Sequence, residues 1–431
     1  MKNILMILAV ILILAMLPLA LFSCNKEEPT EEPTEAPTEA PTEAPTETPT
    51  EAPKPSYDDA VLTQTTYTFS DKASTEKIKT LGRTMLDAEK GICFDHTATG
   101  IEFDAVVEGD IFIDVFCEAV NDNEAYLTIF IDGRRRADQY DEKDANGNGL
   151  RAWSYAPVKE GQNTIKIARN LVKDAHNIKI VKQTEANYAS LSIKSVSMKG
   201  YFLERPADKQ YYIEFIGDSL TCGMGAVGNP TIEKAQGKDG ADWEDGTLGQ
   251  AYLTAEQLGA DYSIVSESGI GVASSWFDDI FDFYFKESFK RDPKKDHDFA
   301  NARTPDLIVI NLGTNDFYIN RDAPNRVVGS FKARTKELIN TIRTKYGTDV
   351  PILWVSGIWS DVSVETDVIK QIDAAISELG GETNGIYRFV VSPNEQNKWG
   401  AEGHPSQKGH QQTAKEIVNF IKEKNLIPTE Q

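Results

Sequence analysis

The sequence predicts a chain with two folded domains, an all-β domain followed by an α/β domain whose parallel sheet is covered by helices on both faces. In residues 60–205, short runs alternate apolar and polar residues between turn residues, which is typical of an antiparallel β-sandwich or jelly roll. From residue 211 onward, short apolar runs alternate with segments of helical spacing, which is typical of a parallel sheet.

The N-terminal segment is predicted to target the chain for export. Lys2 precedes an apolar run of 19 residues, Ile4–Phe22, and Cys24 follows after a single serine. This pattern resembles a bacterial lipoprotein signal, so we interpret residues 1–23 as a signal peptide and Cys24 as the residue that receives the lipid. An uncleaved transmembrane anchor is the alternative, because the run is just long enough to span a bilayer. Both interpretations place the chain at the extracellular face of the bacterial cell membrane.

Residues 24–57 are predicted to form a disordered linker rich in Pro, Thr and Glu. Periodic proline favours an extended polyproline II chain, and the glutamates repel one another. Such a spacer would hold the folded domains away from the membrane. The chain carries a net charge of −22 and no basic block. Nucleic acid is therefore not expected as a partner, because phosphate binding depends on clustered Lys and Arg.

The all-β domain is predicted to span residues 58–205. Its expected strands are 101–107, 111–120, 125–131, 163–168, 178–182 and 191–201. Asp132-Gly133 is predicted to be a hairpin turn. Residues 141–150, DEKDANGNGL, lack the terminal Glu and the spacing of an EF-hand calcium loop, so we interpret them as a solvated loop.

Three cysteines remain once Cys24 is assigned to lipid. Cys93 and Cys117 lie in strand-like segments and could pair in an oxidising compartment. Cys222 would then be unpaired and is expected to pack beneath a turn.

The α/β domain is predicted to span residues 206–431. Its expected strands are 211–216, 262–265, 307–312, 352–355 and 388–391. Helical spacing is clearest at 331–346, 366–379 and 408–422.

Three stretches of this domain lie where predicted strands end, and a fourth lies near the C-terminus. Ser219 lies in a glycine-rich turn directly after the strand 211–216. The second stretch, SESGIG at 266–271, offers two glycines after the second strand. The third is LGTND, which carries Asn315 after the third strand, and the fourth is HPSQKGH, which begins at His404 near the C-terminus. Ligands of open α/β folds bind at the carboxyl edge of the sheet, so we expect these groups to meet there. Each stretch alone is also compatible with an ordinary turn.

Together these residues form a coherent set for acyl transfer, with Ser219 and His404 as the catalytic pair. The serine hydroxyl needs a base, and a histidine can take its proton and return it to a leaving alcohol. The N–H groups of Ser219 and Gly271 and the Asn315 amide could stabilise the oxyanion. His404 is expected in a loop because a proline follows it, whereas His410 falls inside the next helix and is expected to be structural.

These blocks resemble a known enzyme family. GDSL at 217–220, SGIG at 268–271, GTND at 313–316 and the late His404 resemble the blocks of the SGNH (GDSL-type) hydrolases. The resemblance covers residues 211–425. An all-β domain before such a domain, together with the variant IEFIGDSLTCGMG, further resembles the family 2 carbohydrate esterases, which are similar to acetyl xylan esterases.

The resemblance implies a flavodoxin-like three-layer α/β/α domain after a jelly roll. It implies Ser219 as the nucleophile and Ser219, Gly271 and Asn315 as the oxyanion hole. Gly269 competes with Gly271 for this role, and counting from the strand favours Gly271.

The wider superfamily has an Asp three residues before its catalytic His, and here that position is Ala401. Some family 2 carbohydrate esterases also lack this Asp. The resemblance to these enzymes implies a Ser–His dyad in which a backbone carbonyl orients the imidazole. Glu402 is also an acid, but it lies two residues before His404 instead of three. Its carboxylate would therefore have to approach the imidazole by a different route from that of the superfamily's Asp.

The function implied by the resemblance is a carbohydrate esterase that removes O-acetyl groups from polysaccharide of the acetyl xylan or mannan type. The signal pattern adds a lipid anchor, and we expect the chain to be a monomer. No cofactor is implied, and no His-x-x-x-His or Cys-x-x-Cys spacing indicates a metal site. One alternative is a polysaccharide-binding lipoprotein with a vestigial site, in which Trp153, Trp243, Trp276 and Trp399 could stack on sugars. The other is an SGNH esterase or lipase that acts on another acyl ester.

Overall fold

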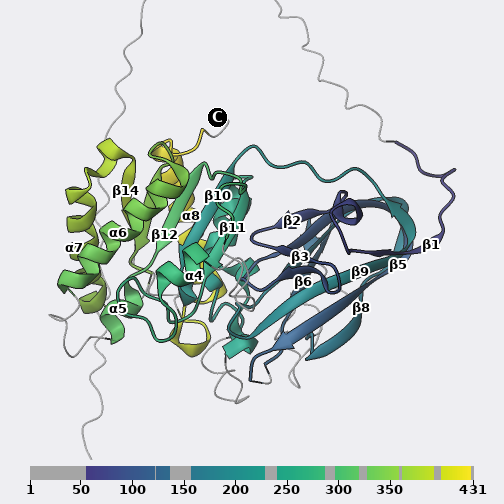
Figure 1. Ribbon diagram of the computed structural model, residues 1–431, viewed down its shortest axis with the longest axis horizontal. Coiled ribbons are helices and arrows are strands. Elements are labelled where there is room, and N and C mark those ends of the chain that lie inside the picture. The colour runs from purple at the N-terminus through teal and green to yellow at the C-terminus, as the bar shows by residue number, and fades with distance from the viewer. Residues whose placement is uncertain are drawn as a thin grey trace, which may run out of the picture. The chain divides into compact units, whose positions relative to one another are not determined.

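The computed structural model describes residues 55–121, 123–135, 157–228, 240–286, 297–319, 328–358, 362–392 and 399–428. The predicted signal peptide, Cys24, nearly all of the linker, the 141–150 loop and Trp153 lie outside these residues. The described residues belong to one compact unit, residues 55–431, which contains an antiparallel and a parallel sheet (Figure 1). No helix in this part of the chain is long and apolar enough to cross a membrane.

The N-terminal domain is antiparallel and β-rich, as predicted. Its nine described strands follow the order β3-β4-β9-β5-β8-β6-β7, while β1 pairs with β9 and β2 with β5. Their bounds are β1 (Gln64–Thr68), β2 (Lys79–Leu81), β3 (Met85–Asp87), β4 (Gly91–Phe94), β5 (Gly100–Ala119), β6 (Leu127–Ile131), β7 (Arg134–Arg135), β8 (Gly161–Lys182) and β9 (Ala189–Phe202). The predicted hairpin turn at Asp132-Gly133 joins β6 to β7, and both of its residues have positive φ, as such turns require.

Two long strands, β5 and β8, each replace a pair of shorter predicted strands. Glu108-Gly109-Asp110 has the composition of a turn, yet β5 continues through it with register shifts around Gly109. Gly109 has a φ of +88°, and Asn170 on the facing strand has a φ of +50°. A β-bulge absorbs these left-handed residues while the ladder continues on both sides. The predicted break is therefore a bend within one strand.

Cys93 and Cys117, which the sequence left as a possible pair, are both buried free thiols. Cys93 faces Ser192 on one side of β9, and Cys117 faces Leu191 on its other side. One intervening strand therefore separates them by two strand spacings, about 9–10 Å. A disulfide requires Cα atoms within about 7 Å.

The α/β domain contains a parallel sheet with the strand order β11-β10-β12-β13-β14. The bounds are β10 (Tyr212–Gly217), β11 (Asp261–Ser266), β12 (Leu307–Asn311), β13 (Ile352–Ser356) and β14 (Ile386–Val390). This is the doubly wound order of flavodoxin-like folds, and the predicted fold class is confirmed. β11 lies on one side of β10 and β12 on the other, so the order in which strands are added to the sheet reverses at β10. This topological switch point lies at the end of the strand that leads to Ser219.

Helices cover both faces of this sheet (Figure 1). Their bounds are α1 (Ser219–Cys222), α3 (Gln250–Gln257), α4 (Ile280–Lys286), α5 (Thr314–Ile319), α6 (Val328–Tyr346), α7 (Val362–Glu378) and α8 (Gln407–Glu423). Val309 joins a core with Ala255 of α3 and Ile417 of α8. The next residue, Ile310, joins a separate core with Phe331 of α6. Successive strand residues thus face opposite layers, which leaves the carboxyl edge of the sheet for chemistry.

Polar contacts join the two domains. The Tyr262 hydroxyl donates to the carbonyl of Ala98 at 2.9 Å, and the Gly246 N–H donates to the carbonyl of Gln183 at 2.8 Å. Arg83 is buried and donates to the Tyr284 carbonyl at 2.7 Å. Loops of the β-rich domain therefore reach the layers around the parallel sheet.

Candidate active site

The turn after β10 places Ser219 at the carboxyl edge of the sheet. β10 ends at Gly217, Asp218 caps α1 by accepting the Leu220 N–H at 3.1 Å, and Ser219 is the first residue of that helix. Gly217 has no room for a side chain, because a Cβ there would lie 1.9 Å from Thr221 Oγ1. The chain can therefore turn tightly enough to hold Ser219 at the end of the strand.

Ser219 and His404 meet within hydrogen-bond distance, although 185 positions separate them. His404 Nε2 lies 2.9 Å from Ser219 Oγ, and His404 Nδ1 lies 2.8 Å from the carbonyl oxygen of Glu402. A carbonyl can only accept, so Nδ1 carries the proton and Nε2 is left as the acceptor for the serine hydroxyl. This is the tautomer that a general base requires.

The loop that carries His404 is held by backbone contacts. A β-bridge pairs Trp399 with Pro405, and the Gly400 N–H donates to the His404 carbonyl at 2.7 Å. Gly225, with a φ of +78°, lies against the loop, and a Cβ at Gly225 would come within 2.7 Å of His404 Cβ. The close approach of this glycine turn brings the imidazole to the serine.

Glu402 orients His404 through its backbone and is itself anchored through its side chain. Its φ of +52° and ψ of +31° lie in the left-handed region, which costs a non-glycine residue about 1 kcal/mol. Its carboxylate accepts the Gly240 N–H at 2.6 Å. The side-chain contact holds the backbone in the conformation that aims the carbonyl at Nδ1.

We expect Glu402→Ala to lower kcat about 10-fold, because a loosened carbonyl no longer fixes the imidazole in its reactive orientation. Glu402→Gln keeps an oxygen for the Gly240 N–H and should retain most of the activity. Steady-state kinetics on a small acetyl ester, with thermal melts of both variants, measures this. Unchanged kcat in folded Glu402→Ala would contradict the assignment.

Ala401 occupies the position where the wider superfamily has an Asp. It is fully buried and packs with Met224 and Trp243. The Glu402 carbonyl already occupies the position beside His404 Nδ1 that such an Asp would take. The structure thus agrees with a dyad oriented by a backbone carbonyl.

Installing the missing acid at this position is expected to fail. Ala401→Asp should lower the free energy of unfolding by roughly 3 kcal/mol, because the carboxylate would be buried beside apolar groups. Ala401→Ser is the smaller control. Urea denaturation measures the difference, and a stable Ala401→Asp variant with a raised kcat would show that the dyad reading is wrong.

Asn315 lies between the nucleophile turn and the turn that carries Gly271. Its side-chain amide donates to the Ile270 carbonyl at 2.9 Å and lies 3.3 Å from Asp218 Oδ2. The Gly271 N–H donates to Ser275 Oγ at 2.9 Å. A substrate oxyanion would have to compete with these acceptors for both donors.

Gly269 differs from Gly271 in its backbone. Its φ of +82° explains the glycine as a turn residue, and its carbonyl accepts the Trp276 N–H at 3.0 Å. Gly271 requires a glycine for another reason, because a Cβ there would lie 2.6 Å from Asp316 Oδ2.

Asp316 is a supporting residue that the sequence analysis missed. Its carboxylate accepts the N–H groups of Val272, Ala273 and Ser274 at 2.5–2.8 Å. Burial raises its pKa to about 6, while these backbone hydrogen bonds oppose the rise. Asp316 thus ties the segment after Gly271 to α5. The only sequence signal for Asp316 was its position as the last residue of the GTND block.

His410 lies inside α8, as predicted, and serves the structure. It is fully buried, and its Nε2 lies 3.4 Å from the Met224 carbonyl. Burial lowers the pKa of His410 from its ordinary 6.5 to about 4. The folded state therefore keeps this imidazole neutral where the unfolded chain would protonate it.

This shift predicts a pH dependence of stability. Because the folded pKa is depressed, the contribution is present above pH 6.5 and is lost as the pH falls towards 4, by roughly 3 kcal/mol. His410→Gln should lack this component. Urea denaturation at pH 7 and at acid pH gives the slopes, and parallel slopes for the two proteins would contradict it.

The tryptophans proposed to contact sugar divide into two groups. Trp243 is 1% exposed and belongs to the core, whereas Trp276 and Trp399 are 57% and 43% exposed. Trp276 bonds to the turn of Gly269, and Trp399 bridges to the loop of His404. The two exposed indoles therefore belong to the two segments that flank the catalytic pair.

The α/β domain is similar to known proteins. Residues 215–412 match the GDSL-like Lipase/Acylhydrolase family. The chain is 28% identical over 295 residues to the cellulase/esterase CelE of Acetivibrio thermocellus, covering 65% of this chain and 33% of that protein. It is 24% identical over 266 residues to an acetylxylan esterase / glucomannan deacetylase of Cellvibrio japonicus, covering 59% of this chain and 65% of that protein. The chain thus spans about a third of the length of the first relative and just under two thirds of the length of the second.

The fold is similar to that of a family two carbohydrate esterase from Clostridium thermocellum, solved in complex with cellohexaose. The TM-score is 0.68 at 21% identity, over 81% of this chain and 100% of that chain. This likeness covers both domains and confirms the fold.

Proposed function

Because residues 215–412 form a GDSL-like lipase/acylhydrolase domain, we propose that this chain is a carbohydrate esterase that removes O-acetyl groups from polysaccharide of the acetyl xylan or mannan type. The proposal depends above all on the 2.9 Å contact between His404 Nε2 and Ser219 Oγ, with Nδ1 held by a backbone carbonyl. A nucleophile beside an oriented base is the arrangement that activates a serine hydroxyl.

In the first half of the reaction, Ser219 Oγ attacks the acetyl carbonyl and its proton passes to His404 Nε2. The negative charge moves to the carbonyl oxygen, where the N–H groups of Ser219 and Gly271 and the Asn315 amide would stabilise it. When the tetrahedral intermediate collapses, the C–O bond to the sugar breaks. The sugar oxygen takes the proton from His404 and leaves as an alcohol, with the acetyl group bonded to Ser219.

In the second half, water attacks the acetyl-serine and gives its proton to His404. The same donors would stabilise the second oxyanion. Collapse releases acetic acid, and Ser219 Oγ regains the proton from the imidazole. The enzyme returns to its starting state, and no cofactor is consumed.

A sugar polymer is the substrate class that the surroundings of the site favour. Trp276 and Trp399 have exposed indoles and belong to the segments of Gly269 and of His404, and flat aromatic rings offer apolar faces next to polar edges. The curated relatives named above support the same class. The preference for a given length of sugar polymer would then depend on these rings, while cleavage of the acetyl ester depends on the dyad.

Export and lipid anchoring complete the proposal. The apolar run Ile4–Phe22 followed by Cys24 supports a lipoprotein at the extracellular face of the membrane, and the Pro-Thr-Glu linker would let it reach a polymer.

The experiment that tests the function is acetate release from acetylated xylan, mannan and glucomannan, with each polymer also supplied after alkaline deacetylation. Release from at least one acetylated polymer, and from none of the deacetylated ones, is expected. Binding to the polymers without acetate release would instead indicate a polysaccharide-binding protein. Turnover of long-chain esters alone would indicate a lipase.

A further inference from the structure

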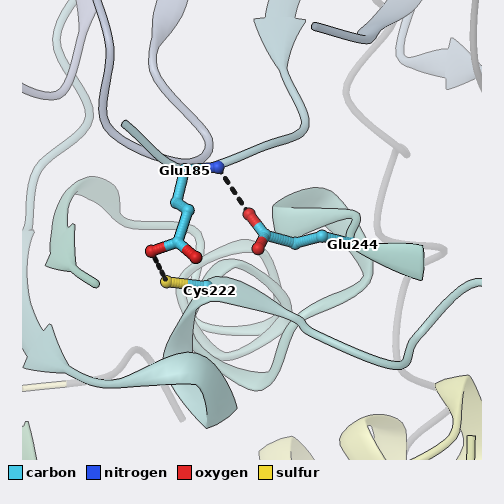
Figure 2. A group of neighbouring side chains, drawn as sticks. All are labelled: Glu185, Cys222 and Glu244. Atoms are coloured by element: carbon cyan, nitrogen blue, oxygen red, sulfur yellow. Dashed lines mark hydrogen bonds between the residues drawn. The ribbon is translucent and has the colours of Figure 1, made fainter. Parts of the chain in front are cut away.

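A buried cluster joins the β-rich domain to the active-site turns. Glu185 comes from the loop between β8 and β9, Cys222 from α1, and Glu244 from the segment after the 3-10 helix Gly240–Trp243 (Figure 2). The side chains are fully buried, and one ligating atom of each lies within 4.8 Å of the others. Burial and the neighbouring carboxylates raise the pKa of the Cys222 thiol well above its usual range, and the thiol is fully buried beneath the turn.

The Glu185 carboxylate touches both turns that build the site. Its Oε2 accepts the Ser268 N–H at 2.6 Å, in the turn that leads to Gly271. The same oxygen accepts the Cys222 thiol at 3.6 Å, three residues after Ser219. Figure 2 shows the carboxylate of Glu185 directed at this thiol. One side chain of the β-rich domain thus links the nucleophile helix to the turn that presents a candidate oxyanion donor.

The backbone of Glu185 is itself held from both domains. The carboxylate of Glu244 accepts its backbone N–H at 2.5 Å (Figure 2). Lys182 Nζ donates to its carbonyl at 3.0 Å and to the Asp95 carbonyl at 2.9 Å. The loop that carries Glu185 is therefore fixed at several backbone atoms, so its carboxylate provides a rigid point of attachment.

Burying these charges is unfavourable. Burial lowers the pKa of Lys182 to about 8 and raises that of Glu244 well above its usual range. Replacing such a cluster by apolar residues is often neutral or stabilising, so stability alone does not account for it. The contacts of Glu185 with both catalytic turns suggest that the cluster holds these turns in position.

We propose that Glu185 is a positioning residue of the active site, and that the β-rich domain is thereby part of the catalytic scaffold. The inference rests on the esterase function proposed above. Without its acceptor, the half-buried Ser268 N–H would lose its hydrogen bond to Glu185, and the turn to Gly271 would move relative to Ser219. Oxyanion donors act on the transition state, so the loss should appear in kcat rather than in KM.

The test compares Glu185→Ala, Glu185→Gln and Lys179→Met in the full chain on a small acetyl ester. Glutamine keeps an oxygen for the Ser268 N–H. Lys179 is the matched control, because it contacts Glu256 of α3 across the same domain boundary at 3.3 Å and touches neither catalytic turn. Thermal melts confirm folding, and hydrogen exchange reports the Ser268 amide.

We expect Glu185→Ala to lose kcat on the order of 10²-fold with KM changed less than about threefold. Glu185→Gln should recover most of the loss, and Lys179→Met should match wild type. A kcat within about twofold of wild type in folded Glu185→Ala, or an equal loss in Lys179→Met, overturns the proposal.

Two further readouts keep the inference separate from the proposed function. If the wild-type chain shows no turnover, the proposed function fails, and faster exchange of the Ser268 amide in Glu185→Ala than in Glu185→Gln still supports the positioning role. Unchanged exchange overturns it. Elemental analysis is expected to find no bound transition metal. One equivalent of tightly held metal would overturn the proposal, because Glu185, Cys222 and Glu244 would then be its ligands.

Discussion

Replacing Ser219 with alanine should lower kcat for a small acetyl ester by at least about 10⁴-fold, because the variant loses the atom that forms the acyl-enzyme. The hydroxyl contacts His404 Nε2 at 2.9 Å, so its loss removes the nucleophile while the backbone of the turn stays in place. KM should change little, since the ester still meets the same surroundings in the variant. Initial rates at several substrate concentrations measure both constants.

Ser197→Ala is a suitable control for this variant. Ser197 bonds to Thr66 within the β-rich domain at 2.8 Å, so its loss removes a serine hydroxyl outside the site. Both variants should melt near the wild-type temperature. A loss of only about twofold in Ser219→Ala would reject the serine mechanism, because loss of a nucleophile costs orders of magnitude.

His404→Ala should cost at least about 10³-fold in kcat, because Ser219 then lacks its base and the sugar alkoxide lacks its acid. Added imidazole should restore part of the rate, since the variant leaves space beside the serine. His404→Gln can still hydrogen-bond the serine but cannot exchange its proton, and it should be equally slow.

The second histidine provides the contrast for this prediction. His410 is fully buried in α8 and contacts the Met224 carbonyl, so His410→Gln should change stability more than kcat. If His404→Ala keeps near-normal turnover while His410→Gln abolishes it, the base has been assigned to the wrong histidine.

The parallel sheet and the catalytic pair were accessible from sequence because both depend on local patterns. Each parallel strand is a short apolar run, and each was predicted within two residues of its observed bounds. Ser219 and Asn315 each follow such a run, and His404 lies in the loop before α8. Once strand order is that of a doubly wound fold, their meeting at one edge follows from topology.

The features that sequence reasoning missed depend on contacts between distant segments. The break expected at Gly109 is a bulge, because strand pairing with β8 and β9 outweighs the local turn composition. Cys93 and Cys117 failed to pair because β9 lies between them. The Glu185 carboxylate contacts Ser268 and Cys222 of the other domain, and no local pattern distinguishes Glu185 from other loop glutamates.

Direct detection of the acyl-enzyme is the most decisive measurement. Rapid acid quenching of the full chain during turnover of an aryl acetate, followed by peptide mass spectrometry, should find one acetyl group on Ser219 and none in Ser219→Ala. The acetylated fraction should rise before steady state and persist longer in His404→Ala supplied with imidazole, where deacylation is slow. Turnover with no acetyl group on Ser219, or with the acetyl group on Cys222, would contradict the mechanism.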